Sequence, residues 1–386
     1  MITALAIQGF RSIRHLVVPL AGLTVVSGEN GVGKSSVYRS LRLLAEVAQT
    51  SAVAALAREG GLQSTLWAGP ESGASASQRY GHPVQGSIRK NAISLKLGYA
   101  STDFGYAIDF GLPTDQGTMF ARDPEIKAEA VFSGAVLRPA TSLSERRNGS
   151  VRIRSSDGGW VAHDHRLRPV ESMVAAFADP GLVPELLSVR QSLGSWRFYD
   201  HFRTDPDSPV RQPQLGTHTP VLSHNGNDVA AAIQTIREYG NGRLLDKVVA
   251  RAFDGATVRV ESQEGQFSLV MQQPGLLRPL STSELSDGTL RFLLLTAALL
   301  SPQPPTLLVL NEPETSLHPR LIEPLAELIT AAAERTQIVV VSHSAALADG
   351  LAAEGAARIN LAKPAGETVM EGQGMLDEPA WNWPQR

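Results

Sequence analysis

The sequence predicts an α/β protein with a mixed sheet core, an antiparallel β lobe and an inserted helical subdomain. Three observations lead to this prediction. An apolar, strand-like run at 23–27 enters a glycine-rich turn and then a helical pattern. Buried-type strands at 306–310 and 337–341 alternate with helices toward the other end. The long middle is first strand-like and then helical, so it is inserted into a core of parallel strands.

The patterns divide the 386 residues into an N-terminal lobe at 1–169, a mostly helical insertion at 170–255 and a C-terminal lobe at 256–386. Small, polar residues at 68–87 predict a mobile loop within the first lobe. A helix is expected over 34–57. Glycine, proline, aspartate and asparagine separate the short strand-like segments of this lobe, which indicates an antiparallel sheet; the segments lie near 92–99, 105–111, 125–133, 150–154 and 158–162.

The C-terminal lobe begins with two short strands, at 256–261 and 266–272. Apolar periodicity then predicts helices at 284–300 and 317–333, on either side of the strand at 306–310. A final strand is expected near 357–362.

The composition excludes several classes of protein. Apolar residues make up 42% and charged residues 19%, which is typical of a folded chain and not of a disordered one. The chain has no cysteine, which excludes disulfides, thiolate zinc sites and a cysteine nucleophile. A net charge of −3 excludes a polycation that coats DNA, although it leaves room for a local basic surface.

No segment suggests export or a membrane span. The first residues lack the charged start and apolar core of a signal peptide, and the most membrane-like run, 292–300, is far shorter than the roughly 20 residues that a bilayer requires. We therefore expect a cytoplasmic protein without a membrane partner.

Residues 28–35, Gly-Glu-Asn-Gly-Val-Gly-Lys-Ser, match the pattern G-x4-G-K-[ST] between a predicted strand and a predicted helix. Glycines let the backbone wrap a phosphate chain, and the helix start directs its positive dipole end at the phosphates. We expect Lys34 to neutralise phosphate charge and Ser35 to be a ligand of Mg²⁺. The nucleotide-binding candidates also include neighbours of these two, namely Asn30, Gly31, Val32, Gly33 and Ser36.

Polar residues follow both buried-type strands, where ligands bind in open α/β sheets. Glu312 is the candidate that polarises the attacking water. Asn311 occupies the position that usually carries a metal-associated aspartate; it can support a Mg²⁺-bound water but lacks the charge. His343 is the candidate sensor of the γ-phosphate, although a lone histidine after a strand is more often structural.

Ser286 and Gly288 open an apolar helix and would form a second anion site, with a hydroxyl and exposed N–H groups. Taken alone, Ser-Asp-Gly before a helix is more often a simple N-cap. Its position shortly before the strand that leads to Glu312 favours the anion site.

Together these motifs resemble the ABC-type ATPase heads of the SMC, RecF and OLD (overcoming lysogenisation defect) class. The sequence Asn-Glu-Pro-Glu-Thr-Ser-Leu-His-Pro at 311–319 is similar to that of stand-alone AAA-type ATPases within this class. The resemblance covers 1–50 and 275–350. It implies a P-loop NTPase fold of the ABC-ATPase-head type and slow hydrolysis of ATP with Mg²⁺. It also implies a head-to-head homodimer, in which Ser286 and Gly288 close over the nucleotide of the other copy.

The resemblance also assigns two further segments. Gly9-Phe10-Arg11-Ser12 matches the opening pattern of the class, which places Arg11 near the nucleotide. Residues 314–319 match the D-loop that communicates across the dimer; Thr315 or Ser316 could equally cap a helix with Pro319 in its first turn. We assign no Q-loop glutamine.

The partner of the protein is left open by the sequence. Seven arginines face three acidic residues between 138 and 168, which fits a solvated sheet face, our preferred interpretation, or a DNA surface. His163 and His165 would diverge on a strand, and Asp200 with His201 gives no supported catalytic pair. The predicted function is an ATPase in DNA repair or phage defence. The alternative is a weakly hydrolysing regulator of an effector protein, such as a nuclease or toxin.

Overall fold

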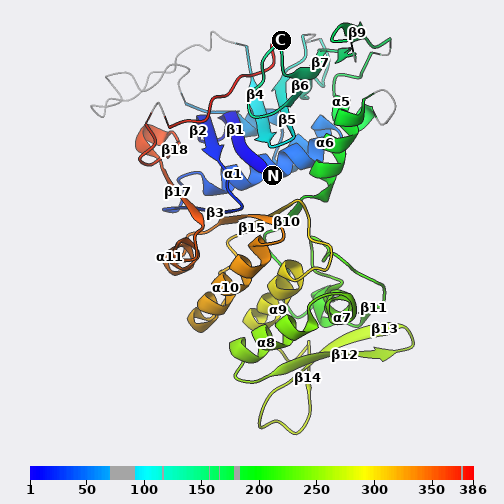
Figure 1. Cartoon of the computed structure of the whole chain (residues 1–386), viewed down its shortest axis with the longest axis vertical. Coiled ribbons are helices and arrows are strands. Elements are labelled where there is room, and N and C mark those ends of the chain that lie inside the picture. The colour runs from blue at the N-terminus through cyan, green and yellow to red at the C-terminus, as the bar shows by residue number, and fades with distance from the viewer. Residues whose placement is uncertain (70–91, 115–116, 156, 165, 178–182, 375–376) are drawn as a thin grey trace. The chain divides into compact units, whose positions relative to one another are not determined.

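The computed structural model describes residues 1–69, 92–114, 117–155, 157–164, 166–177, 183–374 and 377–386 (Figure 1). From residue 70 onward, the loop predicted at 68–87 therefore lies outside the described residues. The chain forms two compact units. Unit 1 comprises Met1–Ala21, Gly28–Trp196 and Ile359–Arg386, and unit 2 comprises Gly22–Ser27 and Arg197–Arg358.

Unit 1 contains an antiparallel sheet of eight strands in the order β2-β1-β4-β5-β6-β7-β8-β9. The strands are β1 (Ile2–Phe10), β2 (Ile13–Pro19), β4 (Leu95–Ser101), β5 (Phe104–Gly111), β6 (Glu125–Ser133), β7 (Ser142–Arg147), β8 (Ser150–Arg154) and β9 (Trp160–Ala162). The predicted antiparallel lobe is thus confirmed. The prediction missed β7 because the residues that it buries are polar: Ser142, Ser144 and Arg146.

Helices cover the sheet of unit 1: α1 (Lys34–Val47), α2 (Ala52–Arg58), α3 (Leu62–Thr65), α5 (Met173–Ala176) and α6 (Pro184–Ser195). Helix α1 contacts β1 and β4, and α6 contacts β5 and β6 (Figure 1). The single helix expected over 34–57 is wrong. The structure ends α1 at Val47 and starts α2 after Ser51, whose side chain accepts a hydrogen bond from the Ala54 N–H at 3.2 Å.

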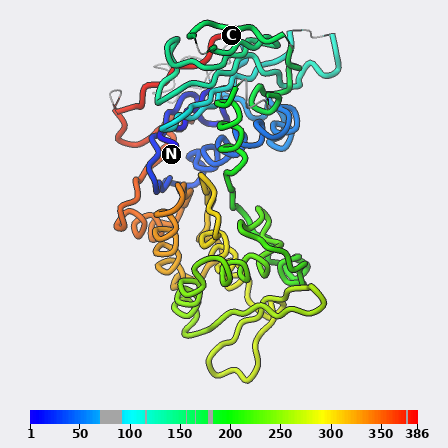
Figure 2. Tube along the Cα trace, turned by 45° about the vertical axis from the view of Figure 1, so that its right-hand side comes forward, coloured from blue at the N-terminus to red at the C-terminus, as the bar shows by residue number. Residues whose placement is uncertain are grey.

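The C-terminal segment packs on a sheet face of unit 1 that is lined mainly by alanine. Trp381 and Trp383 contact a cluster that includes Ala4, Ala100 and Ala130, and Figure 2 shows this segment running beside the strands. The approach is close: a Cβ atom on Gly98 would lie 2.5 Å from the Trp381 ring. Small residues in β1, β4, β5 and β6 therefore leave the space that the indole rings fill.

Unit 2 is built on four parallel strands in the order β10-β15-β16-β3. They are β10 (Arg197–Tyr199), β15 (Leu307–Asn311), β16 (Gln337–Val341) and β3 (Leu23–Gly28), of which Gly28 itself belongs to unit 1. Both predicted buried-type strands are confirmed, and β16 is buried throughout. The register pairs Tyr199 with Leu310, Asn311 with Val341, and Val341 with Val26, so these strands end at one edge.

Helices and short antiparallel strands complete unit 2. The helices are α7 (Val229–Tyr239), α8 (Gly242–Ala252), α9 (Asp287–Leu299), α10 (Ile322–Ala333) and α11 (Ala345–Ala353), with 3-10 turns η1 (Pro209–Arg211) and η2 (Pro319–Leu321). The strands are β11 (Gln214–Leu215), β12 (Thr257–Gln263), β13 (Gln266–Gln272) and β14 (Leu280–Ser281). One continuous apolar core joins α7–α11 to the parallel strands.

The helix expected over 317–333 begins later than predicted, and its cap differs. His318, not Thr315 or Ser316, caps the 3-10 turn η2 by accepting a hydrogen bond from the Arg320 N–H, with Pro319 at the first position; α10 follows. The final strand, β17 (Ala357–Ala362), is confirmed. It pairs with β18 (Val369–Met370) across the turn η3 (Pro364–Gly366). No helix in the described residues is both long and apolar enough to cross a membrane.

Candidate functional site

The glycine-rich loop at 28–33 leads directly into α1, as the sequence predicts. Gly33 precedes the helix with a left-handed φ of 109°, no side chain caps the first turn, and the Ser36 N–H donates to the Gly33 carbonyl at 2.9 Å. Lys34 is buried, and its Nζ atom donates to the carbonyls of Gly28 at 2.7 Å and Glu29 at 2.8 Å. Ser35 is exposed on the same turn.

Thr368, which directly precedes β18, supports this loop, and the sequence alone did not suggest it. Thr368 is fully buried; its hydroxyl donates to the Val32 carbonyl at 2.7 Å and lies 2.8 Å from the Ser12 hydroxyl. A Cβ atom on Gly33 would lie 2.3 Å from this hydroxyl, so glycine is required there by contact as well as by φ. Arg11 forms an ion pair with Glu59 at 2.6 Å.

In unit 2, acidic and histidine side chains gather where β15 and β16 end. The Glu312 N–H donates to the Val341 carbonyl at 2.7 Å, and Glu312 has a left-handed φ of 48°. The His343 Nδ1 atom lies 3.7 Å from Glu312 Oε1 and 3.3 Å from Glu314 Oε1. Both Glu312 and His343 are partly exposed, as groups that act on a ligand must be.

Glu314 holds the segment that carries His343. Its Oε1 atom accepts hydrogen bonds from the Ser342 hydroxyl at 2.6 Å, the His343 N–H at 3.0 Å and the Ser344 N–H at 3.1 Å. The carboxylate is buried, so it acts as a fixed anchor for the end of β16. The sequence placed Glu314 only within the D-loop. Its anchoring role depends on a contact between two strand ends that lie far apart in sequence.

Asn311 pairs with a carboxylate on the neighbouring strand. Its amide Nδ2 donates to Asp200 Oδ1 at 2.8 Å, while its buried Oδ1 has no hydrogen-bond partner among the described residues. Asp200 directly follows β10, which lies beside β15. The pattern that could have indicated Asp200 is its position after the apolar pair Phe198-Tyr199, which parallels that of Asn311 after β15.

Arg291 links α9 to these strand ends. Its buried guanidinium lies 3.3 Å from His201 Nδ1 and donates to the carbonyls of Asp200 at 3.2 Å and Glu312 at 3.5 Å. Burial lowers the pKa of Arg291, and the nearby carboxylates oppose this shift. Arg291 is one turn from Gly288, so its hydrogen bonds connect the first turns of α9 to the backbone of Asp200 and Glu312.

Ser286 and Gly288 lie at the start of α9, where the Ser286 side chain accepts a hydrogen bond from the Thr289 N–H at 3.2 Å. A pocket of about 600 Å³ in unit 2 brings them together with Ser316, His318 and Arg320. A Cβ atom on Gly288 would lie 2.8 Å from the Ser316 carbonyl oxygen, so glycine allows α9 to approach the D-loop. Residues 285–288, here called the signature motif, and the predicted D-loop at 314–319 thus both contribute to one concave surface.

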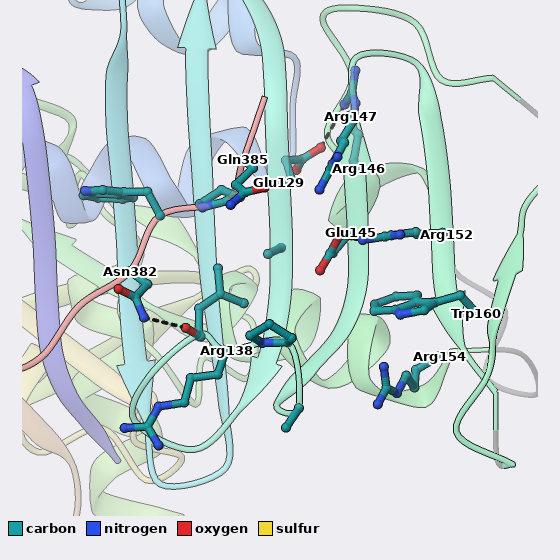
Figure 3. Close-up of a pocket in the computed structure, with 16 residues that line it drawn as sticks. Glu129, Arg138, Glu145, Arg146, Arg147, Arg152, Arg154, Trp160, Asn382 and Gln385 are labelled. Atoms are coloured by element: carbon teal, nitrogen blue, oxygen red, sulfur yellow. Dashed lines mark hydrogen bonds and ion pairs between the residues drawn. The ribbon is translucent and has the colours of Figure 1, made fainter.

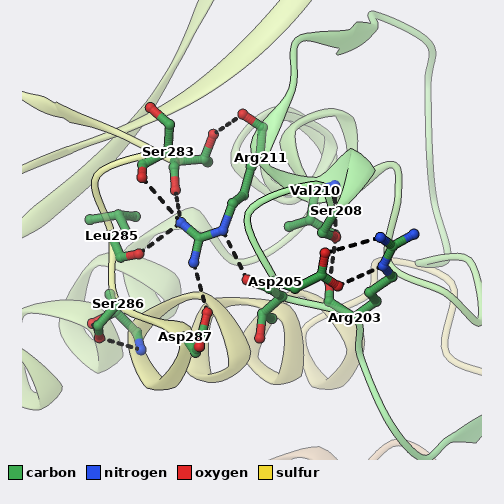
Figure 4. Close-up of polar contacts among 12 residues, drawn as sticks. Arg203, Asp205, Ser208, Val210, Arg211, Ser283, Leu285, Ser286 and Asp287 are labelled. Carbon is green, nitrogen blue, oxygen red and sulfur yellow. Dashed lines mark hydrogen bonds and ion pairs between the residues drawn. The ribbon is translucent and has the colours of Figure 1, made fainter.

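Arg211 holds the backbone of the signature motif (Figure 4). Its Nη1 donates to the carbonyls of Thr282 at 2.7 Å and Leu285 at 2.9 Å, and its Nη2 pairs with Asp287 at 2.7 Å. Its Nε donates to the Thr204 carbonyl at 2.9 Å. The side chain is only 9% exposed, so these bonds are made largely out of water. Sequence reasoning did not identify Arg211, because most of its partners are about 70 residues away in the sequence.

We expect Arg211→Ala to loosen the signature segment and to lower the free energy of unfolding by about 2–3 kcal/mol, because buried carbonyls lose a charged donor. Arg203→Ala is the matched control. Arg203 lies in the same segment, but it is 59% exposed and its ion pair with Asp205 is on the surface, so we expect a change below about 0.5 kcal/mol. Denaturant unfolding measures both. Equal effects of the two variants would contradict the role of Arg211.

The structure thus distributes the predicted site residues between its units. Arg11 and the candidates at 30–36 lie in unit 1, whereas Ser286, Gly288, Asn311, Glu312 and His343 lie in unit 2. His165 lies outside the described residues, and the described residues contain no group of three or more histidine and acidic side chains that could hold a metal by itself.

A buried lysine at the head of a helix, behind a loop of glycines, is the means by which P-loop proteins hold phosphate groups. The comparisons with known proteins agree with this class. The family model described as "AAA domain, putative AbiEii toxin, Type IV TA system" matches residues 23–349, and the chain belongs to this family. No curated protein matches the chain.

Solved structures show the fold. The Smc head bound to the C-terminal winged-helix domain of ScpA has a TM-score of 0.51 at 13% identity, over 97% of this chain and 98% of that chain. The SMC head domain from Thermotoga maritima has a TM-score of 0.47 at 13% identity, over 97% and 99% of the two chains. The predicted ABC-ATPase-head fold is confirmed.

Proposed function

We propose that the protein binds ATP with Mg²⁺ and hydrolyses it slowly as a head-to-head homodimer in the cytoplasm. The observation that carries the proposal is the start of α1, where left-handed Gly33 leads the glycine-rich loop into a helix without a side-chain cap and buried Lys34 directs its Nζ atom to that loop. The fold of an ATPase head and membership of an AAA family support it.

The phosphates would be held by the loop and neutralised by Lys34. The Lys34 ammonium donates to the Gly28 and Glu29 carbonyls, which orient it toward the loop. Asn30, Gly31, Val32, Gly33 and Ser36 would contact the nucleotide around it. Glu312 would orient the attacking water and accept its proton, and His343 would donate to a γ-phosphate oxygen.

The dimer would complete each site with the signature motif of the other copy. Ser286 and Gly288 line a concave surface together with the D-loop residues Ser316 and His318. The hydroxyl of Ser286 and the N–H groups at the start of α9 suit a γ-phosphate, and Arg291 would relay its arrival to the backbone of Asp200 and Glu312. Arg11, which pairs with Glu59, would act at the edge of the site.

The residues present fit a hydrated Mg²⁺. Asn311 Oδ1 is a buried acceptor without a partner among the described residues, and Asp200 places a carboxylate 2.8 Å from the amide of the same residue. When bound, Mg²⁺ neutralises phosphate charge. Ser35 would be its direct protein ligand, and Asn311 would accept from a water. We propose that Asp200 supplies the negative charge that asparagine lacks at position 311.

Moving the carboxylate from position 200 to position 311 tests this assignment. We expect Asp200→Asn to weaken the Mg²⁺-dependent part of ATP affinity about tenfold, and the double variant Asp200→Asn/Asn311→Asp to restore it. Fluorescent ATP binding at stepped Mg²⁺ concentrations is the readout. Asp207→Asn, an exposed change in the same loop, is the control and should have no effect. If the double variant is as weak as Asp200→Asn, the assignment is wrong.

The test of the function is phosphate release by the purified chain with Mg²⁺, with and without double-stranded DNA. Turnover that Lys34→Ala abolishes would support the ATPase, and stimulation by DNA would support a role in DNA repair or phage defence. The family description names a toxin of a type IV toxin–antitoxin system, which favours a defence role.

The second candidate is a nucleotide-gated regulator that hydrolyses little and controls an effector protein such as a nuclease or toxin. Asn311 favours it, because an amide binds a cation less tightly than a carboxylate does. Turnover in Asn311→Asp but not in the parent protein would support the regulator. Robust turnover in the parent protein would exclude it.

A further inference from the structure

A pocket in unit 1, which takes no part in the proposed reaction, is lined by arginine. It has a volume of about 590 Å³, within the range of small-ligand sites. One wall is formed by β7, β8 and β9, and another by the C-terminal residues 382–385 (Figure 3). Asn382 fixes this second wall by donating to the Leu137 carbonyl at 2.9 Å.

The charges of the pocket are not balanced. Five arginines and two glutamates line it. Arg146 pairs with Glu129 at 2.8 Å, and Arg152 donates to Glu145 at 3.0 Å. The remaining three, Arg138, Arg147 and Arg154, have no carboxylate within ion-pair distance in the part of the chain that the structure describes. Three positive charges therefore remain for a ligand.

The arginines are also ordered by stacking. Arg152 and Arg154 project from the same face of β8, and their guanidinium carbons lie 4.4 Å and 5.2 Å from the Trp160 ring centre. Figure 3 shows Arg152, Trp160 and Arg154 in a row along the wall. Stacking on an indole satisfies the flat faces of the guanidinium groups and leaves the N–H edge of Arg154 to bind, which favours phosphate with its matching oxygen geometry.

We propose that this pocket is a second anion site, which binds the phosphate groups of a small, multiply phosphorylated ligand. Its shape and charge argue against a duplex: proteins that track DNA make on the order of 6–10 phosphate contacts, whereas this concave pocket offers three free arginines. The inference does not depend on ATP hydrolysis. Although the pocket and the phosphate loop are both in unit 1, they have no residue in common.

Calorimetric titration of the full chain with inorganic tripolyphosphate tests the proposal. We expect two binding events per chain: one lost in Lys34→Ala, and the other weakened at least about tenfold in Arg154→Gln and in Arg138→Gln. Arg166→Gln is the matched control, because Arg166 belongs to the same basic stretch but does not line the pocket; we expect less than about a twofold change. Unchanged unfolding midpoints establish that the variants are folded.

A second arm uses a 20-base-pair DNA duplex in place of tripolyphosphate. Weak duplex binding that falls equally in Arg154→Gln and Arg166→Gln, beside the selective loss of tripolyphosphate, would agree with the small-ligand site. Selective loss of duplex binding in Arg154→Gln and Arg138→Gln would identify DNA as the occupant and overturn the proposal. A single tripolyphosphate event, removed by Lys34→Ala alone, would also overturn it.

Discussion

Glu312→Gln is expected to reduce ATP hydrolysis by about 100-fold or more while ATP still binds, because the carboxylate that accepts a proton from the attacking water is lost. Glutamine has the same shape, and the hydrogen bond from the residue 312 N–H to the Val341 carbonyl involves only the backbone. The Lys34 loop is untouched. Trapped ATP should therefore hold two copies together, so the variant should accumulate as a dimer in solution scattering.

The control for this variant is Glu327→Gln, which removes an exposed carboxylate of α10 that pairs with Arg251. It should hydrolyse ATP at the parent rate and should not accumulate as a dimer. Hydrolysis by Glu312→Gln at the parent rate would refute the role of Glu312. Single molecules of that variant at saturating ATP would refute the shared site, even if its hydrolysis were abolished.

Arg146→Met is expected to lower the free energy of unfolding by about 3–5 kcal/mol, since it leaves the Glu129 carboxylate charged and unpaired in the interior. Both side chains are fully buried, with Arg146 Nη1 2.8 Å from Glu129 Oε2. Glu129 also accepts from the Tyr106 hydroxyl at 2.6 Å, the Ser172 hydroxyl at 2.6 Å and the Met173 N–H at 2.9 Å. Burial and this carboxylate raise the pKa of Tyr106, so its hydroxyl remains a donor.

Two further variants separate the ion pair from simple packing. Arg147→Met changes the exposed neighbour and should alter the free energy of unfolding by less than about 0.5 kcal/mol. The double variant Arg146→Met/Glu129→Leu removes both charges and should recover a substantial part of the loss. Chemical denaturation followed by circular dichroism measures all three. A double variant no more stable than Arg146→Met would show that the buried charge is not the cause.

Local pattern was sufficient to predict the parts of the fold and site that are contiguous in sequence. The phosphate loop, the start of α9 and the strand before Glu312 each combine a motif with its own flanking periodicity. What the sequence could not show depends on contacts between distant segments. Arg211, Thr368 and Glu314 are each defined by a partner on another element, and a single sequence contains no signal for such pairings.

The same reason explains the elements that were wrong or missed. Every second residue of β7 is buried although it is polar, and burial of Arg146 depends on its ion pair with Glu129 on β6. The end of α1 at Val47 follows from the Ser51 cap of the next helix, which a continuous apolar pattern conceals. His318, rather than Thr315 or Ser316, is the capping residue, because the 3-10 turn η2 lies between the D-loop and α10.

The left-handed backbone of Glu312 lowers the stability of the fold at the residue whose carboxylate is proposed to act in hydrolysis. A non-glycine residue at a φ of 48° costs on the order of 1–2 kcal/mol, which glycine would largely avoid. Selection for heat resistance alone would then favour glycine at this position, and the carboxylate proposed to act in hydrolysis would be lost. A glutamate at this position, where glycine would relax the backbone, is what the role proposed for its carboxylate in hydrolysis requires.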